Sequence, residues 1–339
     1  MMETVEILKR LCEASYEAVP DSETHKAIIE IMTPLSEKIT TDNLGNIICT
    51  VKSEGKKHVV LSAHADKIGM VVTAIDNATG MLKVAKSGGV DNRTLAASRV
   101  KVTGKKEIKG CVTSTPPHLT KGDRTAVPAI EDLYIDCGLT YDEISEIVSP
   151  GDRAEYHSPV CELLGGRYTG AYMDNCAGCT AVIKACEKLL KDGTDNKITA
   201  IFTTREETGK GGAAASFTAL QPDFAFITDV SFGRAPGVPP EMSSPLGSGG
   251  MICISPILQK EISDFLIETA EKHGIPYTVE VMGSRTMTDS DVAVTAGRGI
   301  KTGLVSVPLT NMHTPVETLD IKDVEAVASI LSAAAKEVM

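Results

Sequence analysis

Histidine and carboxylate side chains recur where predicted β-strands end or a predicted helix begins. In chain order they are His64 and Asp66, Asp174, Glu206 and Glu207, Asp229, and His313. Because the sites of open α/β sheets lie beyond the carboxyl ends of the strands, we expect these side chains to converge. Imidazole and carboxylate groups suit Zn²⁺, Co²⁺ or Mn²⁺. The residue types therefore predict a metal site with up to five ligands.

The mixture of ligands favours a site for two ions. Two ions roughly 3.5–4 Å apart need a bridging carboxylate, and Asp174, at a strand-to-helix turn, is the candidate bridge. The ions would activate a bridging water and polarise a carbonyl, while another carboxylate moves the proton of the water to a leaving amine. Adjacent Glu206 and Glu207 can divide these tasks, one as a ligand and one as the base. Asp66 can accept the second ring N–H of His64 and orient the ring.

Each residue also has a simple structural interpretation. A histidine after a strand is more often a hydrogen-bonded residue than a ligand, and a Glu-Glu pair is usually a solvated face. Asp174 could be the N-cap of the following helix, and Asp229 a turn residue. The shared order and placement of the residues, rather than any one motif, favours the metal site.

The segments that must position these residues alternate between strands and helices. Strands are predicted at 46–52, 58–63, 197–203, 224–229, 250–255, 277–281 and 301–307. Helices are predicted at 175–191, 211–220, 258–273 and 321–338. This alternation predicts an α/β domain whose sheet is covered by helices on both faces.

The stretch 68–162 differs in texture from the rest of the chain. It contains short alternating segments separated by turns rich in Gly, Asn, Asp and Lys, which predicts a small β-rich, barrel-like domain. Pro116-Pro117 and the stretch 120–124 predict an exposed loop within it. The remainder, 1–67 and 163–339, would form one discontinuous catalytic domain.

Composition limits the classes of function. The chain has 339 residues, which suits two domains, and its net charge of −11 disfavours nucleic acid as a ligand. No apolar run reaches the ~18–20 residues of a membrane span, and the first 15 residues lack the apolar core of a signal peptide. The nine cysteines are scattered, which favours reduced thiols and a cytoplasmic location. No Gly-x-Ser-x-Gly motif indicates a serine hydrolase, and we interpret Cys176-x-x-Cys179 as small residues packed under the metal site.

The order of the site residues resembles that of the dinuclear-metal aminopeptidases. The long gap between His64 and Asp174 resembles the M42 family, which includes tetrahedral, deblocking and glutamyl aminopeptidases. The stretches GGRYTGAYMDNCAG, TTREETGKGGAAAS, LGSGGMICIS, TDSDVAVTAG and NMHTPVETLDIKDV carry the likeness, which extends over nearly the whole chain. It implies a zinc-aminopeptidase-like fold, in which helices sandwich a mixed sheet and the inserted domain serves dimerisation or substrate access.

The resemblance also implies roles for individual residues. One metal would be held by His64, Asp174 and Asp229, and the other by Asp174, Glu207 and His313. Glu206 would be the general base and Asp66 the residue that orients His64. The peptide bond between Asp174 and Asn175 would be cis. The cofactors would be two Zn²⁺ or Co²⁺ ions, with Mn²⁺ as an alternative. The substrates would be short peptides, and the assembly a homo-oligomer between a dimer and a tetrahedral dodecamer.

Three departures from the family pattern lie close to the site. Asn175-Cys176 replaces Asp-Arg, the stretch 309–312 (LTNM) lacks the usual Arg-Tyr, and Met287 and Ser290 flank Thr-Asp where Gly and Ala are usual. All ligands remain, so we expect these changes to bear on substrate preference and oligomer contacts.

Other functions remain open at this level. The same water activation suits a deacylase or another amidohydrolase. Some family members are labelled endoglucanases, but glycoside hydrolysis relies on two carboxylates that here are committed to metal. A non-catalytic peptide-binding scaffold would be expected to lack Glu206 or a ligand. For an aminopeptidase, a metal-ligand carboxylate or Asp289 would recognise the free amine.

Overall fold

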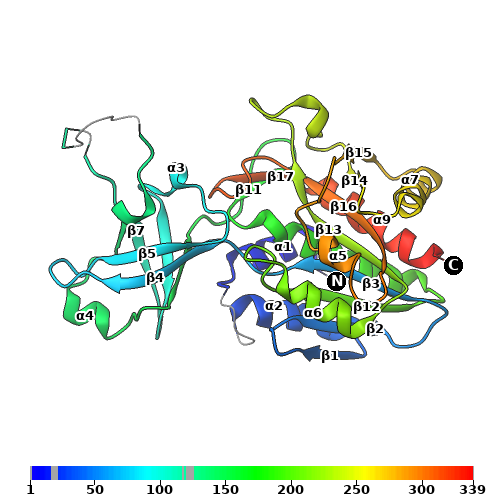
Figure 1. Cartoon of the computed structure of the whole chain (residues 1–339), viewed down its shortest axis with the longest axis horizontal. Helices are drawn as coiled ribbons and strands as arrows, with labels where there is room; N and C mark the ends of the chain where they lie inside the picture. The colour runs from blue at the N-terminus through cyan, green and yellow to red at the C-terminus, as the bar shows by residue number, and fades with distance from the viewer. Residues whose placement is uncertain (1, 17–21, 117, 120–125, 339) are drawn as a thin grey trace.

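The computed structural model describes residues 2–16, 22–116, 118–119 and 126–338. Figure 1 shows two bodies joined side by side, a β-barrel and a larger α/β domain that contains both chain ends. The proposed loop residues Pro117 and 120–124 lie outside the described residues. None of the helices in the described ranges combines the length and the apolarity that crossing a membrane requires.

The α/β domain is built on a mixed sheet. In the described part of the chain it has eight strands, in the order β1 (Lys38–Thr41), β2 (Ile47–Lys52), β12 (Lys197–Thr203), β3 (His58–His64), β13 (Phe224–Phe232), β16 (Lys301–Leu309), β14 (Gly250–Ile254) and β15 (Tyr277–Val281). The four adjacent strands β12, β3, β13 and β16 are parallel. Their carboxyl ends therefore meet at one edge of the sheet.

Helices cover both faces of this sheet, as the sequence predicts. The larger apolar cluster packs one face against α1 (Thr4–Glu13), α2 (Glu23–Met32), α5 (Met173–Asp192), α7 (Lys260–His273) and α9 (Ile321–Glu337). A smaller cluster packs the other face against α6 (Gly211–Leu220) and α8 (Ser290–Ala293). The central strands are apolar on both sides because both sides are buried.

The inserted segment forms a closed antiparallel barrel, which agrees with the predicted barrel-like domain. Among the described residues its strands run in the order β4 (Gly69–Ile75), β5 (Leu82–Ser87), β8 (Tyr134–Asp136), β7 (Glu107–Val112), β6 (Arg99–Thr103) and β9 (Arg153–Tyr156). Two short helices, α3 (Asn92–Leu95) and α4 (Tyr141–Ser145), accompany them. The strands lie within the predicted span 68–162, whose boundaries stay a prediction.

A small sheet connects the barrel to the start of α5. It pairs β10 (Cys161–Glu162), β11 (Arg167–Gly170) and β17 (Glu317–Asp320) in antiparallel fashion. Asp174 follows β11, and His313 lies between β16 and β17. This sheet therefore holds two segments that carry candidate ligands beside each other.

Most predicted elements are present, with shifted ends. The elements at 197–203, 211–220 and 277–281 have the predicted bounds. The predicted strand end at Asp229 is wrong, because β13 continues to Phe232 in register with β16. Helix α5 begins at Met173, but Asp174 and Asn175 have non-helical backbone angles.

Candidate metal centre

The parallel strands bring five candidate residues to the same edge of the sheet. His64 is the last residue of β3 and pairs with Thr203, the last residue of β12. Glu206 and Glu207 follow β12, Asp229 lies in β13, and His313 follows β16. The strand-end argument made from the sequence therefore describes the geometry, although Asp229 lies within its strand rather than at its end.

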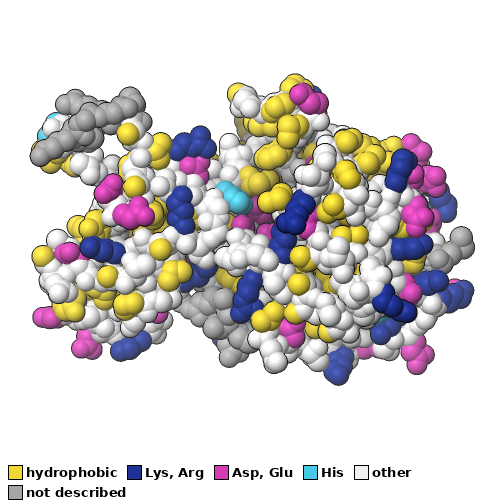
Figure 2. Space-filling model, viewed as in Figure 1, with side chains coloured by type: hydrophobic (Ala, Val, Ile, Leu, Met, Phe, Trp, Pro, Cys, Tyr) yellow, Lys and Arg dark blue, Asp and Glu magenta, His cyan; other side chains and the backbone are white. Residues whose placement is uncertain are grey.

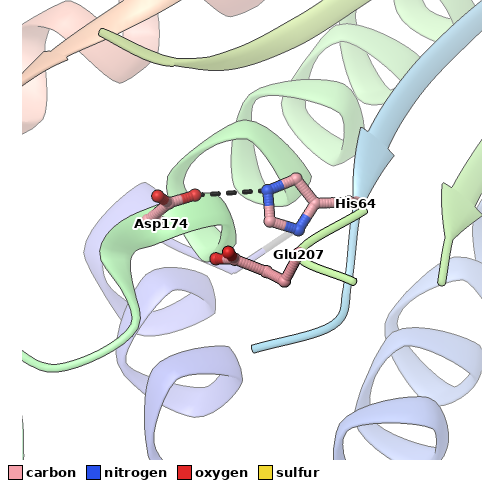
Figure 3. Close-up of side chains that lie close together, drawn as sticks. All are labelled: His64, Asp174 and Glu207. Atoms are coloured by element: carbon pink, nitrogen blue, oxygen red, sulfur yellow. Dashed lines mark hydrogen bonds and ion pairs between the residues drawn. The ribbon is translucent and has the colours of Figure 1, made fainter. Parts of the chain in front are cut away.

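Asp174 approaches this edge from the start of α5 and lies between the two histidines. Its Oδ1 is 3.2 Å from Nε2 of His64, and its Oδ2 is 3.2 Å from Nε2 of His313. The side chain is 7% exposed. Each oxygen of one carboxylate thus faces a different imidazole, the arrangement expected of a residue between two ions. Figure 3 shows Asp174 pointing toward His64, with Glu207 beside them.

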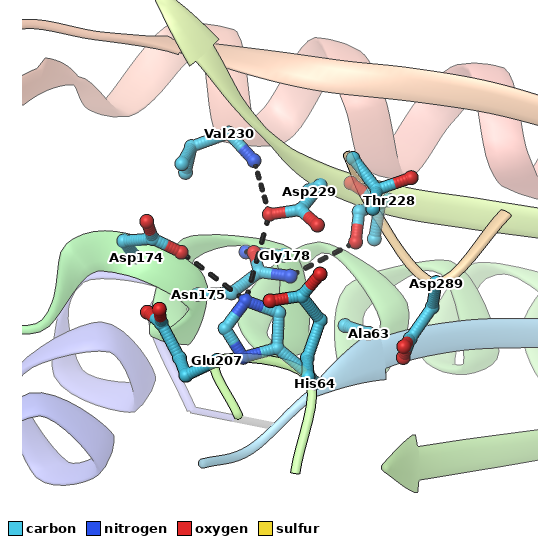
Figure 4. Close-up of polar contacts among 12 residues, drawn as sticks. Ala63, His64, Asp174, Asn175, Gly178, Glu207, Thr228, Asp229, Val230 and Asp289 are labelled. Atoms are coloured by element: carbon cyan, nitrogen blue, oxygen red, sulfur yellow. Dashed lines mark hydrogen bonds and ion pairs between the residues drawn. The ribbon is translucent and has the colours of Figure 1, made fainter. Parts of the chain in front are cut away.

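Each histidine has a second carboxylate nearby. His64 Nε2 lies 3.6 Å from Oδ1 of Asp229, and His313 Nε2 lies 3.5 Å from Oε1 of Glu207. Three of these residues each offer one possible ligand atom, and the three atoms lie within 4.8 Å of one another: His64, Asp174 and Glu207. The five side chains thus divide into two groups that share Asp174, and Figure 4 shows most of this arrangement.

The donor set fits divalent cations. Three carboxylates and two imidazoles, nearly all buried, converge with few other partners, and buried charges of one sign require a counter-charge. Burial lowers the pKa of His313, but its contacts with Asp174 and Glu207 outweigh burial and raise this pKa to about 11. Burial raises the pKa of Asp174, but hydrogen bonds from His313 and His64 lower it overall. A field that holds a proton this strongly also favours a metal cation.

Glu206 lies beside this cluster without belonging to it. Its side chain is 9% exposed, and among the described residues nothing donates a hydrogen bond to its Oε1. The nearest cation is Nζ of Lys210 at 3.8 Å, which Asp291 holds at 3.2 Å. Burial, and after it the charges of Asp229, Asp289 and Glu207, raise the pKa of Glu206 to about 9 against the opposing effect of His64. Its oxygen is therefore available for proton transfer.

Asp66, which the sequence predicts to orient His64, also contacts the two glutamates. Its carboxylate accepts backbone N–H groups from Glu206 at 3.0 Å and Glu207 at 3.1 Å. Its Oδ1 is 3.5 Å from Nδ1 of His64, whereas the main-chain oxygen of Asp66 is nearer, at 3.1 Å. Asp66 therefore fixes the glutamate pair directly, and its role in orienting the ring stays a prediction.

The departures next to Asp174 have defined contacts. The Asp174–Asn175 peptide is cis, which confirms that prediction. The Asn175 side chain donates to the carbonyl of Thr228 at 3.0 Å and accepts from the N–H of Gly178 at 2.9 Å. Cys176 and Cys179 are buried, and Cys179 Sγ lies 3.1 Å from the carbonyl of His64. These contacts agree with the packing role expected for the two cysteines.

Glu317, which the sequence pattern does not single out, also contacts the candidate centre. Glu317 is buried and accepts backbone hydrogen bonds from both Asp174 and His313. Its position four residues after His313 was the available signal. The side chain of Asp289 is also buried, and its Oδ2 accepts a hydrogen bond from the Thr203 hydroxyl, while no described residue donates to its Oδ1. Its role in meeting a substrate amine stays a prediction.

The surface above the centre lies where the two domains meet. Figure 2 shows a histidine with acidic side chains beside it in the middle of this face, between the barrel and the α/β domain. The His313 side chain is 29% exposed, so this side of the candidate centre is open to solvent. A substrate can therefore approach from the face at which the domains adjoin.

Comparisons with known proteins identify the family and agree with the fold. The sequence profile of the M42 glutamyl aminopeptidase family matches residues 45–330. A lysyl aminopeptidase of Pyrococcus furiosus is 30% identical over 315 residues, which cover 91% of this chain and 90% of the relative. An aminopeptidase from Desulfurococcus kamchatkensis has a similar structure, with a TM-score of 0.92, 29% identity and coverage of 99% of this chain and 95% of that one.

A third relative adds information on assembly. The TET1 peptidase of Pyrococcus horikoshii, described as assembling into a tetrahedron or a large octahedral shell, matches with a TM-score of 0.88 and 29% identity. The match covers 99% of this chain and all of the relative. Both the α/β domain and the inserted barrel therefore have counterparts in that peptidase.

Proposed function

Because the chain belongs to the M42 glutamyl aminopeptidase family of metal-dependent peptide hydrolases, we propose that it removes N-terminal residues from short peptides at a dinuclear metal site. The observation that carries this proposal is the position of Asp174. Its two oxygens lie 3.2 Å from the imidazoles of His64 and His313, on opposite sides of one carboxylate.

Two divalent ions fit the two groups of ligands. His64, Asp174 and Asp229 would hold one ion, and Asp174, Glu207 and His313 the other. Zn²⁺ or Co²⁺ suits this mixture of nitrogen and oxygen donors, with Mn²⁺ as an alternative. When bound, the ions supply Lewis-acid chemistry, which polarises the scissile carbonyl and lowers the pKa of the attacking water.

Glu206 would act as the general base. Two bound cations would lower the raised pKa of Glu206, so that its unpartnered Oε1 would take the proton from the attacking water and then deliver it to the nitrogen of the leaving amine. Asp66 supports this task, because it fixes the backbone of Glu206 and Glu207 and so separates the base from the ligand. The free amine of the substrate would meet a ligand carboxylate or Asp289, whose Oδ1 has no donor among the described residues.

The oligomeric state and the location are proposed from the TET1 relative and from the cysteines. The assembly of the TET1 relative supports a homo-oligomer between a dimer and a dodecamer, with the barrel controlling subunit contacts or access. An enclosed site of this kind would select short peptides. All nine cysteines are free, and Cys111 and Cys161 are exposed, which supports a reducing, cytoplasmic location.

Release of amino acids from a mixed peptide library tests the proposal. Metal-reconstituted protein is given free and N-acetylated peptides in parallel, with and without a chelator. Trimming of the free peptides alone, abolished by the chelator, is expected, and the released residues identify the preferred N-terminal side chain. Cleavage of the acetylated peptides alone would instead identify a deacylase. Two bound ions without cleavage of either set would contradict peptide hydrolysis.

A further inference from the structure

The carboxylate of Glu317 joins the two segments that carry Asp174 and His313. Oε2 accepts the backbone N–H of Asp174 at 3.1 Å, and Oε1 accepts the backbone N–H of His313 at 2.7 Å. Glu317 is 2% exposed, so these bonds are shielded from water. The donors come from segments about 140 positions apart in the sequence, and one side chain sets the distance between them.

Neither donor belongs to a strand ladder or to a regular turn of helix. His313 has a φ of 63°, in the left-handed region that non-glycine residues rarely adopt, and Asp174 has a ψ of 107° inside the first turn of α5. Their N–H groups therefore have no place in a helix or strand ladder. A buried carboxyl group whose two oxygens accept both N–H groups fixes the backbone at each ligand through hydrogen bonds that water does not reach.

Glu317 is itself held in place. It is the first residue of β17, and it pairs with Gly170 of β11, four residues before Asp174. The backbone from Gly170 to Asp174 and the backbone from His313 to Glu317 are thus linked twice, by strand pairing and by the side chain. A displacement of either ligand would have to break a buried hydrogen bond.

We propose that Glu317 is a positioning residue that sets the separation of Asp174 and His313 and thereby the affinity for the ion these residues share with Glu207. The inference rests on the proposed metal site. Removal of one acceptor oxygen would leave a buried N–H group unpaired and free one ligand to move. Loss of a residue that orients metal ligands typically lowers metal affinity about 10–100-fold.

The chain offers a matched control at Asp323. This side chain is also buried and also accepts two backbone N–H groups, those of Gly247 and Gly249, each at 2.7 Å. Neither glycine belongs to the candidate metal centre. Asp323→Asn therefore removes the same kind of double acceptor without touching a ligand, and it separates positioning from general stability.

Titration calorimetry of the full-length, metal-stripped protein with Co²⁺ tests the proposal. Wild type is expected to bind two ions per chain. Glu317→Gln, which keeps the shape but only one acceptor oxygen, is expected to bind at least one ion about 10–100-fold more weakly. Asp323→Asn is expected to lower the melting temperature and to bind both ions like wild type. Should Glu317→Gln not fold, Glu317→Asp, whose shorter carboxylate cannot span both donors, is measured instead.

Amide exchange and activity provide independent readouts. In the metal-free protein, peptides that contain Asp174 and His313 are expected to exchange hydrogen faster in Glu317→Gln than in Asp323→Asn. The lost peptidase activity of Glu317→Gln should return at high Co²⁺. Wild-type affinity in Glu317→Gln, or an equal loss in Asp323→Asn, would overturn the positioning role. Failure of wild type to bind two ions would overturn the proposed site itself, together with this inference.

Discussion

The two histidines of the candidate centre lie in different surroundings. The His64 side chain is 2% exposed at the end of a central strand, with β12 and β13 on either side. The His313 side chain is 29% exposed in the connection between β16 and β17, where its backbone depends on Glu317. One half of the centre is therefore built into the sheet, and the other half is attached to it by hydrogen bonds.

This difference separates the tasks of the two halves. The buried half can keep its geometry through packing alone, since neighbouring strands fix the backbone of His64. The exposed half gives access to solvent and substrate, but its geometry depends on a few polar contacts. Variants that affect one half, both halves or neither can test this division.

Loss of the shared residue should have the largest effect. Asp174→Ala removes the carboxylate between the histidines and is expected to abolish binding of the ion pair and to lower kcat/KM by more than about 10⁴-fold. Metal content by mass spectrometry and hydrolysis of free peptides measure both results. Asp195→Ala, at an exposed residue paired with Lys56, is the control and should change neither quantity. Retention of two ions in Asp174→Ala would contradict the bridge.

Loss of the base should affect catalysis but not the metal in either half. Glu206→Gln keeps the size of the side chain and removes its ability to take a proton. We expect two bound ions and a fall in kcat of about 10²–10⁴-fold. Steady-state kinetics at saturating metal measure the fall. Unchanged kcat would assign the base to another residue.

Removal of each histidine should show which half packing supports. In the metal-free protein, His64→Ala leaves a cavity and unpaired carboxylates in the core, and we expect a loss of about 2 kcal/mol or more in the free energy of unfolding. His313→Ala also removes a partner of Asp174 and Glu207, but its side chain is partly exposed, so we expect a smaller loss of about 1 kcal/mol. Urea denaturation compares them. Equal losses would show that exposure does not distinguish the two halves.

A comparison of pH profiles between wild type and His313→Ala should isolate a smaller effect of the exposed half. The pKa of His313 rises from 6.5 to about 11 in the folded protein, so its proton stabilises the metal-free fold fully below pH 6.5. This stabilisation should fall as the pH rises toward 11. Between pH 7 and 9 we expect wild type to lose stability relative to His313→Ala by less than about 1 kcal/mol per pH unit, because solvent screens the group. Parallel pH profiles for the two proteins would exclude this coupling.

The buried half was the easier half to predict from the sequence. His64 follows a largely apolar run, and such a run marks a strand whose end can carry a site. The order of the remaining acidic residues and His313 then identified the ligand candidates. The alternation of strands and helices also predicted the covered sheet, because each pattern has its own period.

The contacts that hold the exposed half could not be predicted from the sequence in the same way. Glu317 and Asp66 act on backbone N–H groups, which every residue type carries, so their partners leave no mark in composition or spacing. The predicted end of β13 is wrong because backbone pairing, too, leaves no mark in the sequence. Asp229 looked like a strand end because it is polar, but pairing with β16 extends the strand beyond it.

The point at which the barrel is inserted has a consequence for fragments of the chain. The barrel begins at Gly69, five residues after His64, and the chain returns to Asp174 only after its last strand. One backbone cut inside the barrel would leave His64 and Asp66 on one fragment and every other site residue on the other. Because β3 lies between β12 and β13, we expect such fragments to stay associated, which would make the centre suitable for complementation from two separately produced pieces.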